Sequence, residues 1–589
     1  MRTNVDTLNS HAETAGTNVR HLPGQNSEEF DVVVLGGGAA GLAAATVAAC
    51  EGLRVLLLEK EPVVGGTSAI SGGACWIPLN HHAGAIIPTD SREAILEYIR
   101  QFTGDRLDTN LFDSFLENGR VAVEYLEAMT SVRFRARPVS PDYRPHLQGA
   151  TLGGRVLEPF EFDARTLGKN LPLLRPPMPE FTAFNGMMVT RPDASAMLGA
   201  FSSISNFRRS CELLARYTFD RLRYGRGTRL VLGNALVAAL LKSALDRGVT
   251  IRTNATPTRL VMQSARLVGG VEYEWQGIRR HVTAKTGVVL TTGGLSGSPA
   301  EIDDAKTRLA RECDVALDHD RGGLSLALSV NAVLSEGNLN DFSCTPVSIF
   351  TRPDNSKAVY PHLVLDRQKP GIIAVNKKGR RFTNEAVSYH DFVEAHQRAH
   401  AVDAASVPAF LICDRHALKK YGLGAVHPGG LEWGHHLRSG YLVKAATIEE
   451  LAKKLGIDPE ALTATVKRAN SFAITGVDSD FGRGSNAYQR FMGDADHGPN
   501  PCLGAIEKPP YFAVCIWPGV QGSARGLAVN VRAQVLDRSG QPIEGLYACG
   551  NAMNSIFCGT YPGPGITLGP AITFGYVIGK DLRARHDGL

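Results

Sequence analysis

A glycine-rich turn near the N-terminus has the residue types and the spacing that bind a phosphate group. Residues 36–41 read Gly-Gly-Gly-Ala-Ala-Gly, so Gly36, Gly38 and Gly41 form a G-x-G-x-x-G pattern. In this pattern the first glycine allows a tight bend, the second lets the backbone approach a pyrophosphate, and the third lets a helix pack closely on a strand. The pyrophosphate then lies at the helix N-terminus, where free N–H groups and the helix dipole favour anions.

The segments around this turn are the ones that a dinucleotide site requires. Residues 31–35 are predicted to form a buried parallel strand, residues 42–51 a helix of small residues, and residues 54–58 a second strand. Glu59 ends the second strand, where its carboxylate can accept hydrogen bonds from ribose hydroxyls. Because strand, turn, helix, strand and acid follow in register, the unit is far more specific than a glycine motif alone.

The loop after Glu59 favours FAD over NAD as the bound dinucleotide. It contains two Gly-Gly pairs separated by hydroxyl residues, so its backbone can wrap a long flavin dinucleotide. We expect the FAD to be held without a covalent bond. Beyond Gly36, Gly38, Gly41 and Glu59, the expected contacts from this region are Ala39, Ala40, Lys60, Gly65, Gly66, Thr67, Ser68, Ser71, Gly72 and Gly73.

With this loop the sequence resembles the glutathione-reductase-type FAD fold, in its fumarate-reductase-like branch. Later segments fit that fold: a helix at 230–244, a turn and strand at 248–254, and two strands that run into glycine turns at 287–294 and 545–551. The resemblance implies an α/β protein whose Rossmann-like FAD domain, 30–300 plus 505–589, carries an inserted α+β substrate domain at 300–505. It also implies FAD contacts from Thr292, Gly293, Gly550 and Asn551, with Asn551 against the ribityl chain.

Two further stretches, 66–78 and 561–570, resemble the corresponding parts of 3-ketosteroid Δ1-dehydrogenases. The resemblance covers most of residues 30–585 and is weakest at about 165–225, which looks like an insertion. It implies that Thr567 and Leu568 also contact FAD, and that a helix begins near residue 571 and points at the pyrimidine edge of the flavin.

The same resemblance implies that three tyrosines are catalytic. Tyr143, in the sequence PDYRP, is similar to the family's first active-site tyrosine, and Tyr389, in RRFTNEAVSY, is similar to its catalytic base. Tyr561 and Gly565, in YPGPG, match the pair that holds the substrate ketone.

The reaction that this resemblance implies removes two hydrogens from the carbon pair next to a ring ketone. Hydrogen bonds from Tyr561 and Gly565 would stabilise the enolate that develops on the ketone oxygen. Tyr389 would take the α-proton while FAD takes the β-hydride. Since the pKa of a free tyrosine is about 10, the base needs help near neutral pH. Tyr143 is expected to provide that help through a hydrogen bond to the phenolate.

Two departures from the steroid enzymes leave the substrate open. Ser388 stands where they are expected to have proline, and His390 lies beside the expected base and is the next candidate for it. A Δ4-ketosteroid dehydrogenase and a desaturase of smaller cyclic ketones are therefore alternatives. A fumarate-reductase-like enzyme would need histidine and arginine for carboxylates, and residues 521–526 lack the histidine. A flavin-binding electron-transfer protein without its own substrate is the alternative from another class.

The composition sets wider limits on partners and metals. The chain has 589 residues, a net charge of +5 and ten cysteines without a CxxC pair. These values predict at least two domains, no nucleic-acid partner and a reducing cytoplasm, with an electron acceptor that the sequence does not identify. The histidine pairs 81–82 and 435–436 are expected to face different ways, so no metal is assigned.

The N-terminal region raises the question of targeting and membrane segments. Residues 1–29 are polar and are expected to form a disordered leader rather than a secretory signal. The uncharged run 32–50 has the length of a membrane span, but the nucleotide-binding turn explains it better. We therefore expect no transmembrane segment.

Overall fold

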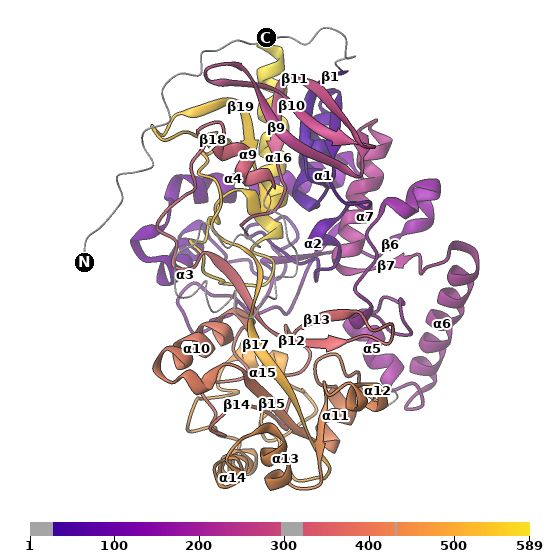
Figure 1. The fold of residues 1–589 in the computed structure, drawn as a ribbon, viewed down its shortest axis with the longest axis vertical. Coiled ribbons are helices and arrows are strands. Elements are labelled where there is room, and N and C mark those ends of the chain that lie inside the picture. The colour runs from indigo at the N-terminus through magenta and orange to yellow at the C-terminus, as the bar shows by residue number, and fades with distance from the viewer. Residues whose placement is uncertain (1–27, 296–321, 430–432, 589) are drawn as a thin grey trace.

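The computed structural model describes residues 28–295, 322–429 and 433–588. Its larger sheet contains the predicted nucleotide-binding unit and lies at one end of the molecule (Figure 1). The strand order is β18-β19-β10-β11-β1-β2-β8, with β9 beside β10. The strands are β1 (Glu28–Leu35), β2 (Val55–Leu58), β8 (Thr250–Arg252), β9 (Ala255–Ser264), β10 (Leu267–Trp275), β11 (Ile278–Leu290), β18 (Gln534–Leu536) and β19 (Pro542–Ala548).

The central strands of this sheet are parallel and apolar, as expected for strands that are covered on both faces. β1 pairs in parallel with β2 and β11, and β11 pairs in parallel with β19, which comes from the C-terminal part of the chain. The four residues from Val32 to Leu35 have no exposed surface. The parallel strand ends therefore meet at one edge, where the glycine turn follows β1.

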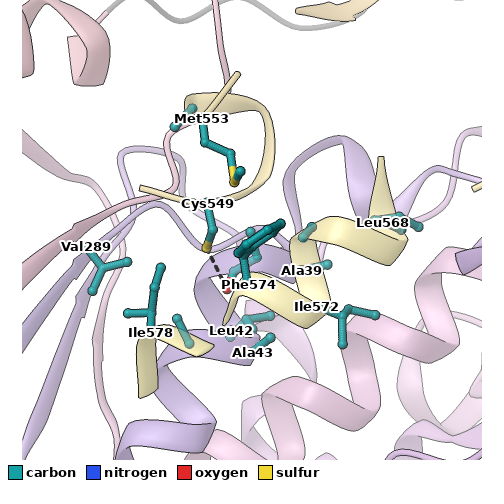
Figure 2. Packing of buried hydrophobic residues seen from close by; sticks show 14 of the residues in the cluster. Ala39, Leu42, Ala43, Val289, Cys549, Met553, Leu568, Ile572, Phe574 and Ile578 are labelled. Atoms are coloured by element: carbon teal, nitrogen blue, oxygen red, sulfur yellow. Dashed lines mark hydrogen bonds between the residues drawn. The ribbon is translucent and has the colours of Figure 1, made fainter. Parts of the chain in front are cut away.

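The helix α1 (Ala39–Cys50) packs next to this sheet against two other helices, α7 (Leu232–Asp246) and α16 (Leu568–Asp587). α1 and α16 approach closely because both present small residues. A Cβ added at Gly579 of α16 would lie 2.5 Å from a methyl of Val47, so no larger residue fits there. Figure 2 shows Ala39, Leu42 and Ala43 of α1 packed against Ile572 and Phe574 of α16. This contact fixes the N-terminus of α1, where the phosphate is expected.

A second sheet lies at the opposite end of the molecule (Figure 1). Its order is β13-β12-β17-β15-β14, with β16 beside β17. The strands are β12 (Phe342–Thr351), β13 (Lys357–Pro361), β14 (Ile372–Val375), β15 (Ala409–Asp414), β16 (Val443–Ala445) and β17 (Tyr511–Ser523). The helices of this part are α10 (Tyr389–Val402), α11 (Arg415–Tyr421), α12 (Trp433–Arg438), α13 (Ile448–Leu455), α14 (Pro459–Thr475) and α15 (Ala487–Met492).

Shorter elements connect the two parts. A small sheet has the order β3-β5-β4, and β6 pairs with β7. These strands are β3 (Cys75–Trp76), β4 (Phe134–Ala136), β5 (Val156–Pro159), β6 (Phe162–Asp163) and β7 (Arg229–Leu230). The remaining α-helices are α2 (Gly66–Ala69), α3 (Arg92–Thr103), α4 (Thr109–Met129), α5 (Arg191–Leu198), α6 (Ile204–Tyr224) and α9 (Gly322–Leu328). α5 and α6 lie in the stretch that resembles an insertion.

Several expected boundaries differ from the structure. β1 begins at Glu28, so the last two residues of the expected leader are in the sheet, and residues 1–27 lie outside the described residues. β17 lies in the second sheet although its residues fall in the expected 505–589 segment, because it pairs with β12 and β15. The boundary at 300 falls outside the described residues. No helix in the described ranges combines the length and the apolar character needed to cross a membrane.

Candidate active site

A single large cavity of about 1780 Å³ runs from the glycine turn to the three tyrosines. Every predicted cofactor residue lines it except Gly41 and Gly65. Tyr143, Tyr389, Tyr561 and Gly565 also line it. The fold therefore brings into one space residues that are several hundred positions apart in the sequence.

The glycines of the turn have distinct roles in the structure. A Cβ on Gly41 would lie 1.9 Å from the Gly36 carbonyl oxygen, and one on Gly65 would lie 2.7 Å from the Ala69 methyl. These two glycines allow close packing and do not line the cavity, so their assignment as cofactor contacts stays a prediction. At Gly38 the nearest protein atom would be Ser68 Oγ at 3.7 Å, so its missing side chain opens space toward the cavity.

The expected ribose acceptor, Glu59, is buried at the edge of the cavity. It accepts hydrogen bonds from the backbone N–H of Gly37 at 2.7 Å and of Glu61 at 3.0 Å. Burial raises the pKa of Glu59 although both of these N–H groups oppose the rise. A carboxylate has about four acceptor positions, so lone pairs are left over for ribose hydroxyls.

The far end of this glycine-lined region also has groups that suit a flavin. Gln521 lines the cavity, and its side-chain oxygen is buried without a hydrogen-bond partner among the described residues. Asn551 lies next to it, since a Cβ on Gly522 would be 2.6 Å from Asn551 Nδ2. A buried amide oxygen is costly unless a ligand donates to it. The open glycines, the carboxylate and this orphan acceptor together fit an FAD molecule.

The three predicted tyrosines form one buried cluster. The ring centroids of Tyr389 and Tyr561 are 5.1 Å apart, and Tyr143 lies 5.8 Å from each of them. Each tyrosine is at most 6 % exposed. The resemblance that singled out these residues therefore led to side chains that are neighbours in space.

One hydrogen bond and one ion pair hold the three segments together, and a helix cap orients one of them. Ser388 caps the N-terminus of α10 by accepting a hydrogen bond from the Asp391 N–H, so Tyr389 is the first residue of that helix. Arg144 pairs with Asp391 at 2.8 Å, and the Tyr143 N–H donates to the Pro562 carbonyl at 2.9 Å. Ser388, the departure from the expected proline, thus starts the helix that positions the expected base.

Gly565 offers a backbone N–H to the cavity. Its φ is +96°, and a Cβ there would lie 2.4 Å from the Ala74 carbonyl oxygen, so only glycine fits. Its own carbonyl accepts from the Trp76 N–H at 3.0 Å. No group in the described part of the chain accepts from the Gly565 N–H, which leaves this donor for a ligand oxygen.

Burial raises the pKa of all three tyrosines above the ordinary value. The interactions with Tyr143 and Tyr561 raise the pKa of Tyr389 further. At Tyr143 and at Tyr561, by contrast, the hydrogen bond with Tyr389 lowers the pKa. Tyr143 was expected to help Tyr389 ionise. In the structure the contact with Tyr143 instead raises the pKa of Tyr389.

Comparison with known proteins fits this geometry. The family model described as "FAD binding domain" matches residues 31–568. This chain belongs to that family. The flavoprotein is 37% identical over 573 residues to the 4-oxocyclohex-2-ene-1-carboxylate 5-dehydrogenase of Sinomonas cyclohexanicum, with 95% of each chain covered. It is 34% identical to the 4-oxocyclohexanecarboxylate 2-dehydrogenase of the same organism, over 97% of this chain and 96% of the relative.

A solved structure confirms the expected fold of the flavoprotein. The 3-ketosteroid Δ1-dehydrogenase of Sterolibacterium denitrificans, in complex with 1,4-androstadiene-3,17-dione, matches with a TM-score of 0.84 and 32% identity. The match covers 95% of this chain and 100% of the steroid enzyme. The predicted membership in this group of FAD-dependent oxidoreductases is confirmed, and FAD is the cofactor.

His390, the alternative base, is placed poorly for that role in the flavoprotein. Its Nδ1 accepts a hydrogen bond from the Cys344 backbone N–H at 3.2 Å, so the ring proton is on Nε2. Nε2 lies 3.5 Å from a carboxylate oxygen of Glu394. Neither nitrogen is a free acceptor, and His390 does not line the cavity.

Reasoning from sequence missed two residues at the tyrosine end. Tyr488 lines the cavity with its ring 4.8 Å from that of Tyr143, and its buried hydroxyl has no partner among the described residues. Arg137 also lines the cavity. Neither stands in a recognisable motif. Asn384 and Glu385, which precede Tyr389 in the sequence, do not line the cavity.

One expectation about the histidines was wrong. His81 and His82 do not face different ways: their Nε2 atoms lie 2.9 and 3.0 Å from the carboxylate of Glu127. The loop before α3 turns both rings toward α4, with ring centroids 3.9 Å apart. These three side chains are outside the cavity and have no part in the site described above.

Proposed function

We propose that this flavoprotein dehydrogenates the carbon pair next to a ring ketone. The observation that carries the proposal is the pairing of two oxygen-binding donors with a phenol in the cavity that holds FAD. The donors are the Tyr561 hydroxyl and the free Gly565 N–H, and the phenol is Tyr389. The names of the similar proteins agree, because each of them acts on a ring that bears a ketone.

In this proposal the ketone oxygen accepts hydrogen bonds from Tyr561 and Gly565. Negative charge that develops on that oxygen is stabilised, which makes the neighbouring C–H bond more acidic. Tyr389 accepts the α-proton in its ionised form. Bound FAD would supply the oxidising power, as an acceptor for the hydride from the β-carbon. The ring ketone becomes an α,β-unsaturated ketone, and an external acceptor must then reoxidise the cofactor.

The same proposal includes a substrate entrance between the two domains and a reducing cellular compartment. The substrate would enter between the FAD domain, 30–300 plus 505–589, and the inserted domain, 300–505, since ligand sites favour domain interfaces. A reducing compartment such as the cytoplasm suits the nine described cysteines, none of which forms a disulfide.

The test is anaerobic bleaching of the oxidised flavin. Purified enzyme is mixed with cyclohexanone derivatives, with androst-4-ene-3,17-dione and with succinate, and flavin absorbance is followed. Ring ketones should bleach the flavin and yield the unsaturated ketone, whereas succinate should not. Bleaching by succinate alone, or by none of these compounds, would contradict the proposal.

A further inference from the structure

Arg137 brings an uncompensated positive charge to the tyrosine end of the cavity. Its Nε donates to one oxygen of Glu158 at 2.7 Å, and Arg135 Nε donates to the other oxygen at 2.7 Å. Two guanidinium groups thus share one carboxylate, which leaves a net charge of +1. The terminal amino groups of Arg137 donate to no described residue, although the side chain is only 27% exposed.

Arg137 places this positive charge near the expected catalytic residues. Burial raises the pKa of Tyr143 and of the Cys75 thiol, and the charge of Arg137 opposes the rise at both. The strand pairing places Arg137 in the same region, because Ala136 and Cys75 both pair with Leu157 of β5. Residues 137–141 and Tyr143 then form a continuous stretch of the cavity wall. Cys75 precedes Trp76, whose N–H binds the Gly565 carbonyl. Arg137 is thus near the tyrosine cluster on one side and the ketone-holding loop on the other.

Two other arginines and one lysine of the cavity wall are already engaged. Arg209 and Arg229 both bind Asp193, at 2.8 Å each. The Lys369 amine donates to two backbone carbonyls at the end of α15, at 2.7 and 2.8 Å. Compared with these groups, Arg137 keeps a planar pair of N–H donors available, the geometry that matches a carboxylate.

We infer that Arg137 binds a carboxylate substituent on the ring of the ketone substrate. This inference rests on the proposed function and narrows its substrate class to anionic cyclic ketones. A carboxylate there would neutralise the net charge of the Arg135–Glu158–Arg137 group. The substrate would then be held at both ends, by Tyr561 and Gly565 at the ketone and by Arg137 at the carboxylate. Arg137 thereby determines specificity and takes no part in proton or hydride transfer.

The test compares 4-oxocyclohexanecarboxylate with its methyl ester in anaerobic flavin reduction. Arg137→Gln is the test variant. Arg92→Gln is the control, because Arg92 pairs with Asp113 outside the cavity and takes no part in the Arg135–Glu158–Arg137 group. In Arg137→Gln the preference for carboxylate over ester in kcat/KM should fall about 10- to 100-fold, as for the loss of a charge-assisted hydrogen bond. The loss should appear in KM rather than in kcat. Arg92→Gln should keep the preference within about threefold, since an exposed ion pair outside the cavity contributes little.

An equal loss of efficiency for acid and ester in Arg137→Gln would overturn the inference, since a structural role would affect both. A wild-type preference for the ester would overturn it too. If neither compound bleaches the flavin, the proposed function fails and the subsite is judged by binding alone. The carboxylate should then perturb the flavin spectrum of the wild type, with a Kd that rises at least tenfold in Arg137→Gln. An unchanged Kd would overturn the inference.

Discussion

The two ends of the cavity are built in opposite ways. At the nucleotide end, one short segment supplies a turn whose main feature is the absence of side chains, as Gly38 illustrates. At the tyrosine end, Tyr143, Tyr389, Tyr488 and Tyr561 come from four distant segments and are almost fully buried. Cofactor binding is thus encoded locally by backbone shape. The chemistry depends on tertiary packing that brings distant side chains together, so the two ends should respond differently to substitution.

The largest effect should come from filling the space at Gly38. In Gly38→Val the new side chain would meet the ligand rather than the protein, because the nearest protein atom is 3.7 Å from the Cβ position. We expect a folded but colourless protein, with FAD retention measured by absorbance and folding by circular dichroism. Gly41→Val should instead fail to fold, since its Cβ would lie 1.9 Å from a carbonyl oxygen. A yellow Gly38→Val protein would break the distinction between the two glycines.

The next effect belongs to the tyrosine end. Tyr389→Phe removes only a hydroxyl, so the FAD spectrum should be unchanged while flavin reduction by the best ketone slows by about 10²-fold or more. Tyr561→Phe should cost a similar factor, as for one oxyanion donor. Tyr143→Phe should cost less, because Tyr143 contacts the base and not the ketone. Near-normal flavin reduction in Tyr389→Phe would place the proton acceptor elsewhere.

The pH dependence of flavin reduction should follow from burial of the base. Burial raises the pKa of Tyr389 above its ordinary value, and the base acts only when it is ionised. The ionised fraction, and with it the rate, should therefore rise about tenfold per pH unit through the neutral and mildly alkaline range. Stopped-flow measurement at several pH values checks this, and Tyr389→Phe should lose the slope. A rate that levels off at or below pH 7 would point to another base.

The smallest effect should come from the link between the two tyrosine segments. Arg144 pairs with Asp391 at 2.8 Å and is partly exposed, so the pair contributes less than about 1 kcal/mol to stability. Arg144→Met should slow flavin reduction about three- to tenfold by loosening the spacing of Tyr143 and Tyr389, with little change in Tm. Arg92→Met, which removes an exposed ion pair with Asp113, is the control and should change neither value.

The nucleotide end could be predicted from sequence because its signals are local. The strand, glycine turn and helix up to Cys50 were placed within a few residues, and most of the expected contacts line the cavity. The tyrosines were reached only through resemblance. Arg137 and Tyr488 were missed because no local sequence pattern shows which of their side chains face a cavity. Arg137 follows the short strand β4, and Tyr488 lies in the six-residue helix α15. The pairing of β17 with the second sheet was missed for the same reason, since it depends on contacts with distant strands.

Isotope exchange at the α-carbon examines the role of Tyr389 without relying on overall turnover. The ketone is labelled with deuterium at the α-position and incubated anaerobically with enzyme, and label loss to solvent and the rate of flavin reduction are both measured. The wild type should show an isotope effect on flavin reduction or solvent exchange at that carbon, and Tyr389→Phe should lose the exchange. Undiminished exchange in Tyr389→Phe would contradict the assignment of Tyr389 as the base.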